Sequence, residues 1–462
     1  MIDLRSFIRR LEEEGELKRV KAPVELKYEI GAICFKELQQ GINNNKALLF
    51  EQVRGSFMPL ATNLLASPKR YLMALDLASR QEWHRFWVEK TSHPVTPILV
   101  ETAPCQEVTM AQVNLSEFPI PLWNEKDGGH YITMPCVISK DPETKQRNCG
   151  IYRMMVHEDW RSTGILAAPY HHIARHLAKS LTRGGALPVA VAIGVSPAIT
   201  IAAAADFPYG VDEMAMAGAL QGEPVEMTRC TTVPLEVPAH AELVLEGRIV
   251  SREEKEEGPF GEFTGYYASE RCKRPVFKID CITHRRDPLA VGTYVGRPPQ
   301  ENAFLNSQTT EAEMIRQCPF PGIKDLYVNP LGVLNAVVSV RNGSDGYAKK
   351  MGIAMLATEA GRRIKNLIMV DEDIDPRDSD QVSWALAYRV QPERDVEIIK
   401  NVTGVVVDPS MPEEERLSGT NRISKMLIDA TRPENGSFAE ECLPKRELME
   451  RVEVEWKKYA VE

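Results

Sequence analysis

The segment EEGPFGEFTGYY (residues 256–267) places two acids, Glu257 and Glu262, on either side of a Gly-Pro-Phe-Gly run. Pro259 fixes its own φ and disfavours helical backbone just before it, while Gly261 can adopt backbone angles closed to other residues. The segment is therefore predicted to turn, which can bring both carboxylates towards one point. Burial and like charge would raise the pKa of one of them, as a general acid or base requires. A surface loop with solvated acids explains this segment equally well when it is taken alone.

A second segment with chemical potential is NCGIYR at residues 148–153, which begins a strand-like run. Asn148 offers an amide oxygen and Arg153 a guanidinium, and Gly150 permits a bend or the close approach of a ligand. The segment could therefore present both groups to different parts of one ligand. Taken alone, it fits better a strand arginine in an ion pair at the rim of a sheet.

The run PYHHIARH (residues 169–176) places His172 and His176 four residues apart, on one face of a predicted helix. Ile173 stands where a zinc protease needs glutamate, so that class is excluded. The helix start after Pro169 offers free N–H groups for a phosphate, and one histidine with oxygen ligands from elsewhere could hold Mn²⁺ or Mg²⁺ beside it. The alternative is a histidine hydrogen-bonded within the fold.

Other acidic and polar segments carry weaker signals. Glu242 begins the strand-like run ELVLEGRIV, and a glutamate at the start of a strand is mostly solvated. The run DEDIDPRD (residues 371–378) lacks the glycine and the final glutamate of a calcium loop, because Pro376 and Val382 occupy those positions. SGTNRISK (residues 418–425) lacks phosphate-loop spacing, which excludes nucleotide hydrolysis.

Charge and cysteine usage limit the partners and the compartment. With 56 basic and 65 acidic residues the net charge is -9, so the chain has no basic field for nucleic acid or anionic lipid. Nine cysteines without a C-x-x-C pair encode neither a disulfide framework nor a zinc ribbon. The N-terminus predicts an amphipathic helix rather than a signal peptide, and residues 184–205 predict a buried strand followed by a packed helix. We expect a cytoplasmic protein that neither enters a membrane nor binds nucleic acid.

The elements that must position these residues indicate a mixed α/β (α+β) protein of two or three domains. Residues 1–110 mix helices with strands and predict a small α/β unit. Residues 111–310 are mostly short strands separated by Gly and Pro, which suits a barrel or a strongly bent sheet. Residues 311–462 alternate helices with apolar strands, including residues 404–407, and end in a helix with an apolar stripe. That last helix could dock on a partner subunit.

The motifs occur in an order that resembles the UbiD family of reversible decarboxylases, which use prenylated FMN. The order is N-x-G-I-Y-R, a His-Ile pair after a proline, V-P-A-x-x-E-x-x-L-E-G and E-G-P-F-G-E-x-x-G-Y-Y. Similar pieces stand at residues 296–314 and 370–392, so the resemblance spans nearly the whole chain. It implies a central split β-barrel that binds the flavin, between an N-terminal α/β unit and a C-terminal α/β domain with an oligomerisation helix. A homodimer or homohexamer is expected.

The resemblance also implies how the cofactor is held. Asn148 and Glu242 are expected to ligate Mn²⁺ or Mg²⁺ at the cofactor phosphate, together with His171 or His172, and a K⁺ ion is expected nearby. We favour His172 as the metal ligand because it precedes the isoleucine. The residues expected to contact the cofactor are Asn148, Cys149, Gly150, Ile151, Tyr152, Arg153, His171, His172 and Glu242.

The catalytic residues implied by the resemblance are Arg153, Glu257 and Glu262. The modified flavin would supply the electron sink that side chains cannot, since loss of CO₂ from an sp² carbon strands an electron pair. Arg153 would hold the substrate carboxylate and keep Glu257 ionised, while Glu262 would deliver the proton that replaces CO₂. A flavin prenyltransferase would have to supply the cofactor.

The predicted substrate class is narrower than the range of substrates known for the family. Family members act on aromatic, heteroaromatic or α,β-unsaturated acids, and His171, Phe263 and Arg297 are predicted to lie near the substrate. The polar and cationic groups among them favour a polar, planar aromatic or heteroaromatic acid. The alternatives are an ordinary flavin oxidoreductase, or a non-catalytic subunit of a multi-subunit carboxylase, against which the complete Glu-Arg-Glu set argues.

Overall fold

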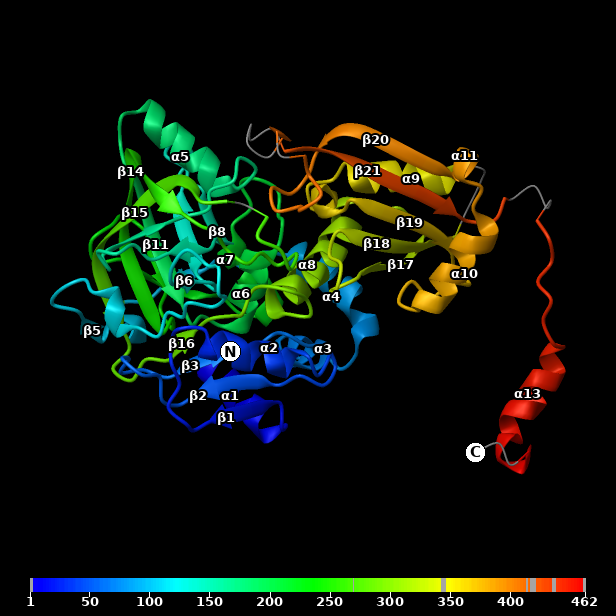
Figure 1. Cartoon of the computed structure of the whole chain (residues 1–462), viewed down its shortest axis with the longest axis horizontal. Helices are drawn as coiled ribbons and strands as arrows, with labels where there is room; N and C mark the ends of the chain where they lie inside the picture. Colours follow the sequence, from blue (N-terminus) through cyan, green and yellow to red (C-terminus); the bar gives the residue numbers. More distant parts are fainter. Residues whose placement is uncertain are drawn as a thin grey trace.

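The computed structural model describes residues 3–268, 270–341, 346–412, 414–415, 421–433 and 438–459, without the side chains of residues 251 and 252. The protein has the predicted mixed α/β fold, built on several sheets (Figure 1). The N-terminal elements lie against one end of the strand-rich central part, and the C-terminal sheet lies beside it. Within the described part of the chain, no helix combines the length and apolar character needed to cross a bilayer.

The N-terminal elements surround a small sheet of order β1-β2-β3-β16, whose last strand returns from much later in the chain. Asp3 begins the first helix by accepting a hydrogen bond from the Ser6 backbone N–H at 2.8 Å. The elements are α1 (Leu4–Glu13), β1 (Leu17–Val20), α2 (Glu29–Leu38), β2 (Ala47–Phe50), β3 (Leu60–Thr62), α3 (Pro68–Ala74), η1 (Arg80–Glu82), α4 (Trp83–Thr91), β4 (Ile98–Leu99) and η2 (Pro104–Gln106).

The central part is an antiparallel sheet of order β10-β15-β14-β11-β7-β8, with β5 paired to β15. The elements of this part of the chain, some of which belong to other sheets, are β5 (Val108–Thr109), η3 (Leu115–Glu117), β6 (Tyr131–Ile132), β7 (Cys136–Lys140), β8 (Arg147–Ile151), β9 (Met154–Met155), β10 (Ser162–Gly164), α5 (His172–Thr182), β11 (Leu187–Ile193), α6 (Pro197–Ala204), α7 (Glu213–Gln221), β12 (Glu226–Arg229), β13 (Glu236–Pro238), β14 (Leu243–Glu257), β15 (Cys272–His284) and β16 (Ala290–Val291).

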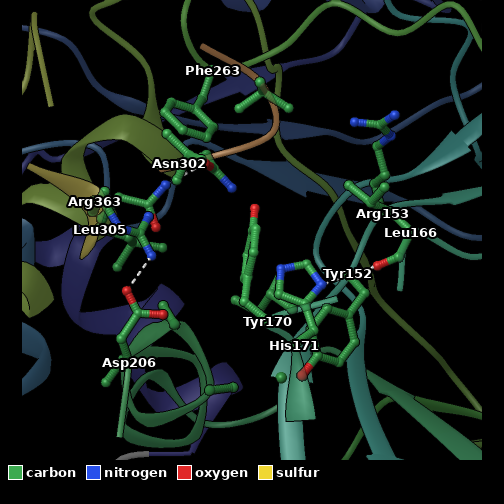
Figure 2. Close-up of a pocket in the computed structure, with 18 of the residues that line it drawn as sticks. Tyr152, Arg153, Leu166, Tyr170, His171, Asp206, Phe263, Asn302, Leu305 and Arg363 are labelled. Carbon is green, nitrogen blue, oxygen red and sulfur yellow. Dashed lines mark hydrogen bonds and ion pairs between the residues drawn. The ribbon is translucent and has the colours of Figure 1, made fainter. Parts of the chain in front are cut away.

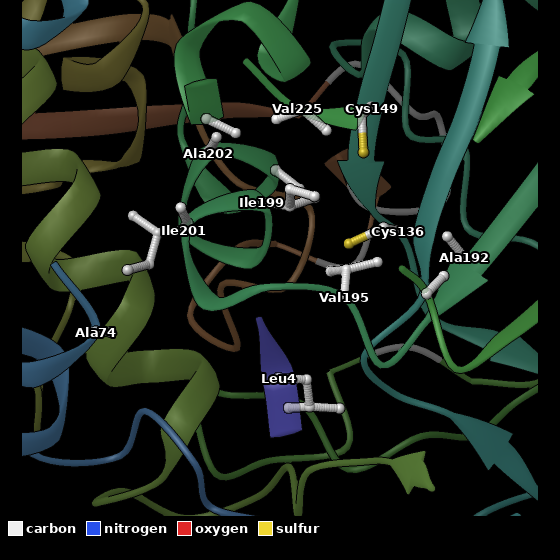
Figure 3. Close-up of a cluster of buried hydrophobic side chains, with 14 of the residues drawn as sticks. Leu4, Ala74, Cys136, Cys149, Ala192, Val195, Ile199, Ile201, Ala202 and Val225 are labelled. Carbon is white, nitrogen blue, oxygen red and sulfur yellow. The ribbon is translucent and has the colours of Figure 1, made fainter. Parts of the chain in front are cut away.

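The strand β11 separates two hydrophobic clusters because its side chains alternate between the faces of the sheet. Ala190 and Ala192 face the cluster that contains α6, whereas Val189 and Val191 face the other one. Figure 3 shows α6 beside the strands that carry Cys136 and Cys149, and Leu4 of α1 reaches the same cluster. Residues 184–205 therefore contain a central strand followed by a packed helix, as predicted.

The long helix α8 (Glu301–Gln317) leads into the C-terminal sheet, and its side chains are buried on every face over most of its length. That sheet has the order β17-β18-β19-β21-β20. Its elements are β17 (Ile323–Val328), β18 (Asn335–Val340), α9 (Tyr347–Leu356), η4 (Ala360–Arg363), β19 (Asn366–Asp371), α10 (Ser379–Arg389), α11 (Pro392–Asp395), β20 (Val396–Thr403) and β21 (Arg422–Ala430).

The predicted strand at residues 404–407 is wrong, because β20 ends at Thr403. The valines that follow, Val405 to Val407, line a cavity and pair with no strand. Apolar runs that line a binding site resemble buried strands in sequence, which explains the error.

The chain ends in an arm that stands away from the body (Figure 1). It contains α13 (Arg446–Val454) and η5 (Trp456–Tyr459), and no residue of either is buried. Large apolar side chains of the arm face solvent, namely Leu443, Leu448, Met449, Val454, Trp456 and Tyr459.

Candidate active site

One cavity gathers nearly all of the predicted cofactor residues, and Figure 2 shows the side chains that point into it. Its walls come from β8, the start of α5, the end of α6, the turn after β14, the first turns of α8, η4 and residues 405–407. The predicted residues that line it are Asn148, Cys149, Gly150, Ile151, Tyr152, Arg153, His171, His172, Glu262 and Phe263.

Arg153 is held between the two predicted glutamates. Its Nε donates to Glu257 Oε1 at 3.2 Å, and its Nη1 donates to the Glu262 carboxylate. The Phe260 ring lies 4.9 Å from the guanidinium carbon. Burial alone would lower the pKa of Arg153, but the carboxylates of Glu262 and Glu257 outweigh it and raise that pKa. The guanidinium is therefore a fixed cation at the cavity wall.

The two glutamates differ in exposure to the cavity. Glu262 lines it, and burial raises the pKa of its carboxyl even though Arg153 acts in the opposite direction. Glu257, at the end of β14, is 1% exposed and is absent from the cavity wall. The expectation that both carboxylates point towards one place in the cavity is therefore corrected, because Glu257 lies behind Arg153.

The turn that carries Glu262 is clamped on both sides. Gly258 has φ +97°, and a Cβ on neighbouring Gly128 would lie 1.9 Å from the Gly258 carbonyl oxygen. The Gly261 N–H donates to Asp127 Oδ1 at 2.8 Å. Burial raises the pKa of Asp127 to about 6. Because the backbone is fixed at these points, the Glu262 side chain has a defined position.

A second group of polar side chains lies around β8. Glu213, the first residue of α7, accepts a hydrogen bond from the Cys149 N–H at 2.8 Å, and its other oxygen lies 4.0 Å from His172 Nδ1. Burial raises the pKa of Glu213 to about 8 and lowers that of His172 to about 4. Asn148 adds an amide oxygen to the same wall. A buried carboxyl, a neutral imidazole and an amide oxygen make a donor set that fits Mn²⁺ or Mg²⁺.

The structure does not bring Glu242 to this group. Both Glu242 oxygens accept hydrogen bonds from Arg5 of α1 at 2.8 Å, and one also accepts from the Leu289 N–H at 3.1 Å. Glu242 lies outside the cavity wall, so the expectation that it binds metal or cofactor is corrected. No trio of His, Cys, Asp and Glu suited to a metal occurs in the described part of the chain, so an amide oxygen is needed to complete a site.

Glu213 was missed because nothing in its local sequence marks it as a ligand. It follows the N-cap Asp212, where an acidic residue is ordinary. Its apolar neighbours in EMAMAGAL were the available signal, since a glutamate on a fully buried helix needs a partner.

Two arginines that sequence reasoning also missed line one end of the cavity. Arg363 Nη2 donates to Asp206 Oδ2 at 2.7 Å and Arg362 Nη2 donates to Asp206 Oδ1 at 3.4 Å. The Arg362 guanidinium carbon lies 3.9 Å from the Tyr170 ring centroid. Arg362 Nε and Nη1 are buried and have no hydrogen-bond partner among the described residues. Glu359, whose Oε1 lies 3.8 Å from Arg362 Nε, also lines the cavity, so two carboxylates face the two guanidiniums. The N–H groups of Arg362 that have no hydrogen-bond partner suit an anionic ligand.

Two of the three predicted substrate residues line the cavity, and the third does not. His171 lines the cavity, and burial lowers its pKa to about 3, so the ring is neutral. Phe263 also lines the cavity. Arg297 is exposed and lies outside the cavity wall, so its predicted role is corrected. Its backbone lies close to Gly265, where a Cβ would be 3.0 Å from the Arg297 Cα.

The chain matches the three domains of 3-octaprenyl-4-hydroxybenzoate carboxy-lyase (UbiD) in succession. The N-terminal domain matches residues 8–87, the Rift-related domain residues 98–298 and the C-terminal domain residues 303–430. A phenolic acid decarboxylase of Bacillus subtilis (strain 168) is 35% identical over 452 residues, which covers 93% of this chain and 92% of that protein.

Known structures agree over the whole chain. The vanillic acid decarboxylase of Sedimentibacter hydroxybenzoicus in closed form has a TM-score of 0.91 and 33% identity, covering 100% of this chain and 99% of that chain. Its open form has a TM-score of 0.83 with 34% identity over 100% and 99% of the two chains. An evolved dimeric form of the UbiD-class enzyme HmfF from Pelotomaculum thermopropionicum, in complex with prFMN, has a TM-score of 0.84 and 32% identity over 97% and 98% of the chains. The chain therefore belongs to the UbiD family of carboxy-lyases.

Proposed function

We propose that this carboxy-lyase removes CO₂ from a phenolic or other polar aromatic acid, with prenylated FMN as cofactor. The observation that carries the proposal is Arg153, a buried cation at the cavity wall with one carboxyl of raised pKa, Glu262, beside it. Relatives named phenolic acid and vanillic acid decarboxylases support the reaction class, and the prFMN complex of HmfF supports the cofactor.

The residues of the cavity fit that cofactor. When bound, prenylated FMN supplies the electron sink for the electron pair left by CO₂. Asn148, His172 and Glu213 would hold Mn²⁺ or Mg²⁺ at the cofactor phosphate, and Arg362 would donate hydrogen bonds to the same anion. A K⁺ ion beside the divalent metal is proposed on the family resemblance alone.

The chain's own groups would then bind the substrate and supply its proton. Arg153 binds the substrate carboxylate through charge-assisted hydrogen bonds, while Glu257 behind it keeps the guanidinium in place. After the C–C bond breaks and CO₂ leaves, Glu262 gives its proton to the carbon that carried the carboxylate. The Glu262 carboxylate then regains a proton from solvent, so the cycle involves no net redox change.

The apolar side chains of the arm at residues 443–459 support assembly into a homo-oligomer, because they would be covered by a second copy of the chain. A flavin prenyltransferase is the proposed cofactor supplier. The nine free cysteines support a reducing compartment, for which we propose the cytoplasm.

The test is co-expression with a flavin prenyltransferase, followed by an absorption spectrum and a screen of aromatic acids for CO₂ release. The proposal predicts a bound modified flavin and CO₂ release without NADH, and loss of release in Arg153→Ala. Full activity with plain FMN, or NADH-dependent flavin reduction without CO₂ release, would contradict it.

A further inference from the structure

We infer that Asn302 and Asn306 recognise a hydroxyl group on the substrate ring, and so select hydroxylated aromatic acids over acids that lack this group. This inference rests on the proposed decarboxylase function and names the residues that narrow its substrate class.

The two asparagines form one hydrogen-bonding unit. They lie four residues apart in the first turns of α8, which places them on one face of the helix. Asn306 Nδ2 donates to Asn302 Oδ1 at 2.8 Å, and both residues line the cavity. Among the described residues, no other group bonds to Asn302 Nδ2 or to Asn306 Oδ1. The unit therefore offers the cavity one donor and one acceptor, and a hydroxyl both accepts and donates.

The start of α8 is fixed relative to the proton donor. Gln300 caps the helix by accepting a hydrogen bond from the Ala303 N–H at 3.1 Å, and its Nε2 donates to the Phe263 carbonyl at 3.3 Å. Phe263 directly follows Glu262. A recognition element whose support is this rigid can set the distance between a ring substituent and the reacting carbon.

The surroundings make unpaired amides costly. Phe263 and Leu305 lie beside Asn302 in the wall, and Figure 2 shows the Asn302 amide pointing into the cavity between Arg153 and Arg363. Buried amide groups without partners cost free energy, so an apolar ligand at this position would be penalised. The unit is uncharged, which suits a neutral hydroxyl better than a second carboxylate.

The experiment compares Asn302→Leu and Asn306→Ala with the wild-type holoenzyme. The control is Thr309→Val, which removes a buried polar group of α8 that bonds to the Leu305 carbonyl and lies outside the cavity wall. Binding of 4-hydroxybenzoate and of 4-methylbenzoate is measured by calorimetry, and kcat/KM is measured for hydroxylated and unsubstituted acids that turn over. The flavin spectrum reports on folding and cofactor retention.

We expect both asparagine variants to lose about 10–100-fold in affinity and kcat/KM for the hydroxylated acid. Each substitution leaves the buried hydroxyl of the substrate without one of its hydrogen-bond partners. The methyl analogue should bind at least as well as to the wild type, and Thr309→Val should keep the wild-type preference. Variants with normal flavin and unchanged hydroxyl preference would overturn the inference. If the hydroxyl preference falls as expected but the wild type releases no CO₂, the proposed decarboxylase function fails and the recognition role stands.

Discussion

Glu262 and Glu257 flank the same guanidinium, yet only Glu262 reaches the cavity. Burial raises the pKa of Glu262, so its carboxyl keeps its proton to a higher pH than an exposed glutamate does. A general acid is active in its protonated form, and the decarboxylation rate should therefore fall as the pH rises through this pKa. Single-turnover rates measured against pH test this, and a rate that stays constant on the alkaline side would contradict it.

The proposed metal site of Asn148, His172 and Glu213 gives a second prediction for single residues. Glu213→Ala should lose the divalent ion and weaken flavin binding by more than the roughly 10–100-fold typical of an outer-sphere residue. Glu242→Ala should keep the metal, because Glu242 is bound to Arg5 and lies outside the cavity. Metal analysis and flavin titration of both variants decide the matter. Metal loss in Glu242→Ala with retention in Glu213→Ala would reverse the assignment.

Among the structural elements, the turn after β14 matters most for the proposed mechanism, because it positions Glu262. Asp127 holds the Gly261 N–H, so Asp127→Ala should leave that donor unpaired and lower the free energy of unfolding by about 1–3 kcal/mol. Turnover should fall as well, because Glu262 loses its fixed position, while Asp127→Asn should retain part of both. Urea unfolding and rate measurements on the two variants provide the check. Equal rates in wild type and Asp127→Ala would show that the turn needs no clamp.

Local signals predicted the elements well where one physical cause dominated. The amphipathic helix α1, the strand β11 with helix α6, and the non-helical backbone at Gly258 all occur where expected. The site was harder to predict, because its parts meet only in three dimensions. The only local signal of Glu213 is its apolar neighbours, and Arg362 has none. Glu242 has a motif position, but its partner in the structure is Arg5. The division into units at residues 110 and 310 stays a prediction.

In the whole molecule, the C-terminal arm exposes apolar side chains that the rest of a single chain does not cover. Removing residues 443–462 keeps Glu441 in contact with Arg389 and Arg432 but deletes the exposed apolar side chains of the arm. We expect the truncated chain to have a smaller assembly mass by light scattering, with an unchanged flavin spectrum. Leu448→Glu is the matched point variant and should weaken the assembly in the same direction. An unchanged mass in both would remove the arm from the interface.

The cavity is also a property of the whole molecule, since central and C-terminal elements both line it. Asp206 follows α6, whereas its partners Arg362 and Arg363 come from η4 beside the C-terminal sheet.

Deuterium exchange into the decarboxylated product measures whether Glu262 supplies the proton that replaces CO₂. The product is incubated in D₂O with wild-type and Glu262→Gln enzymes that carry equal amounts of flavin and metal. For the wild type we expect exchange at the carbon that had carried the carboxylate. In Glu262→Gln the exchange rate should fall by about 10²–10⁴-fold, because glutamine keeps the shape of glutamate but has no acidic proton. Exchange at the wild-type rate in Glu262→Gln would contradict the account and assign the proton to another group.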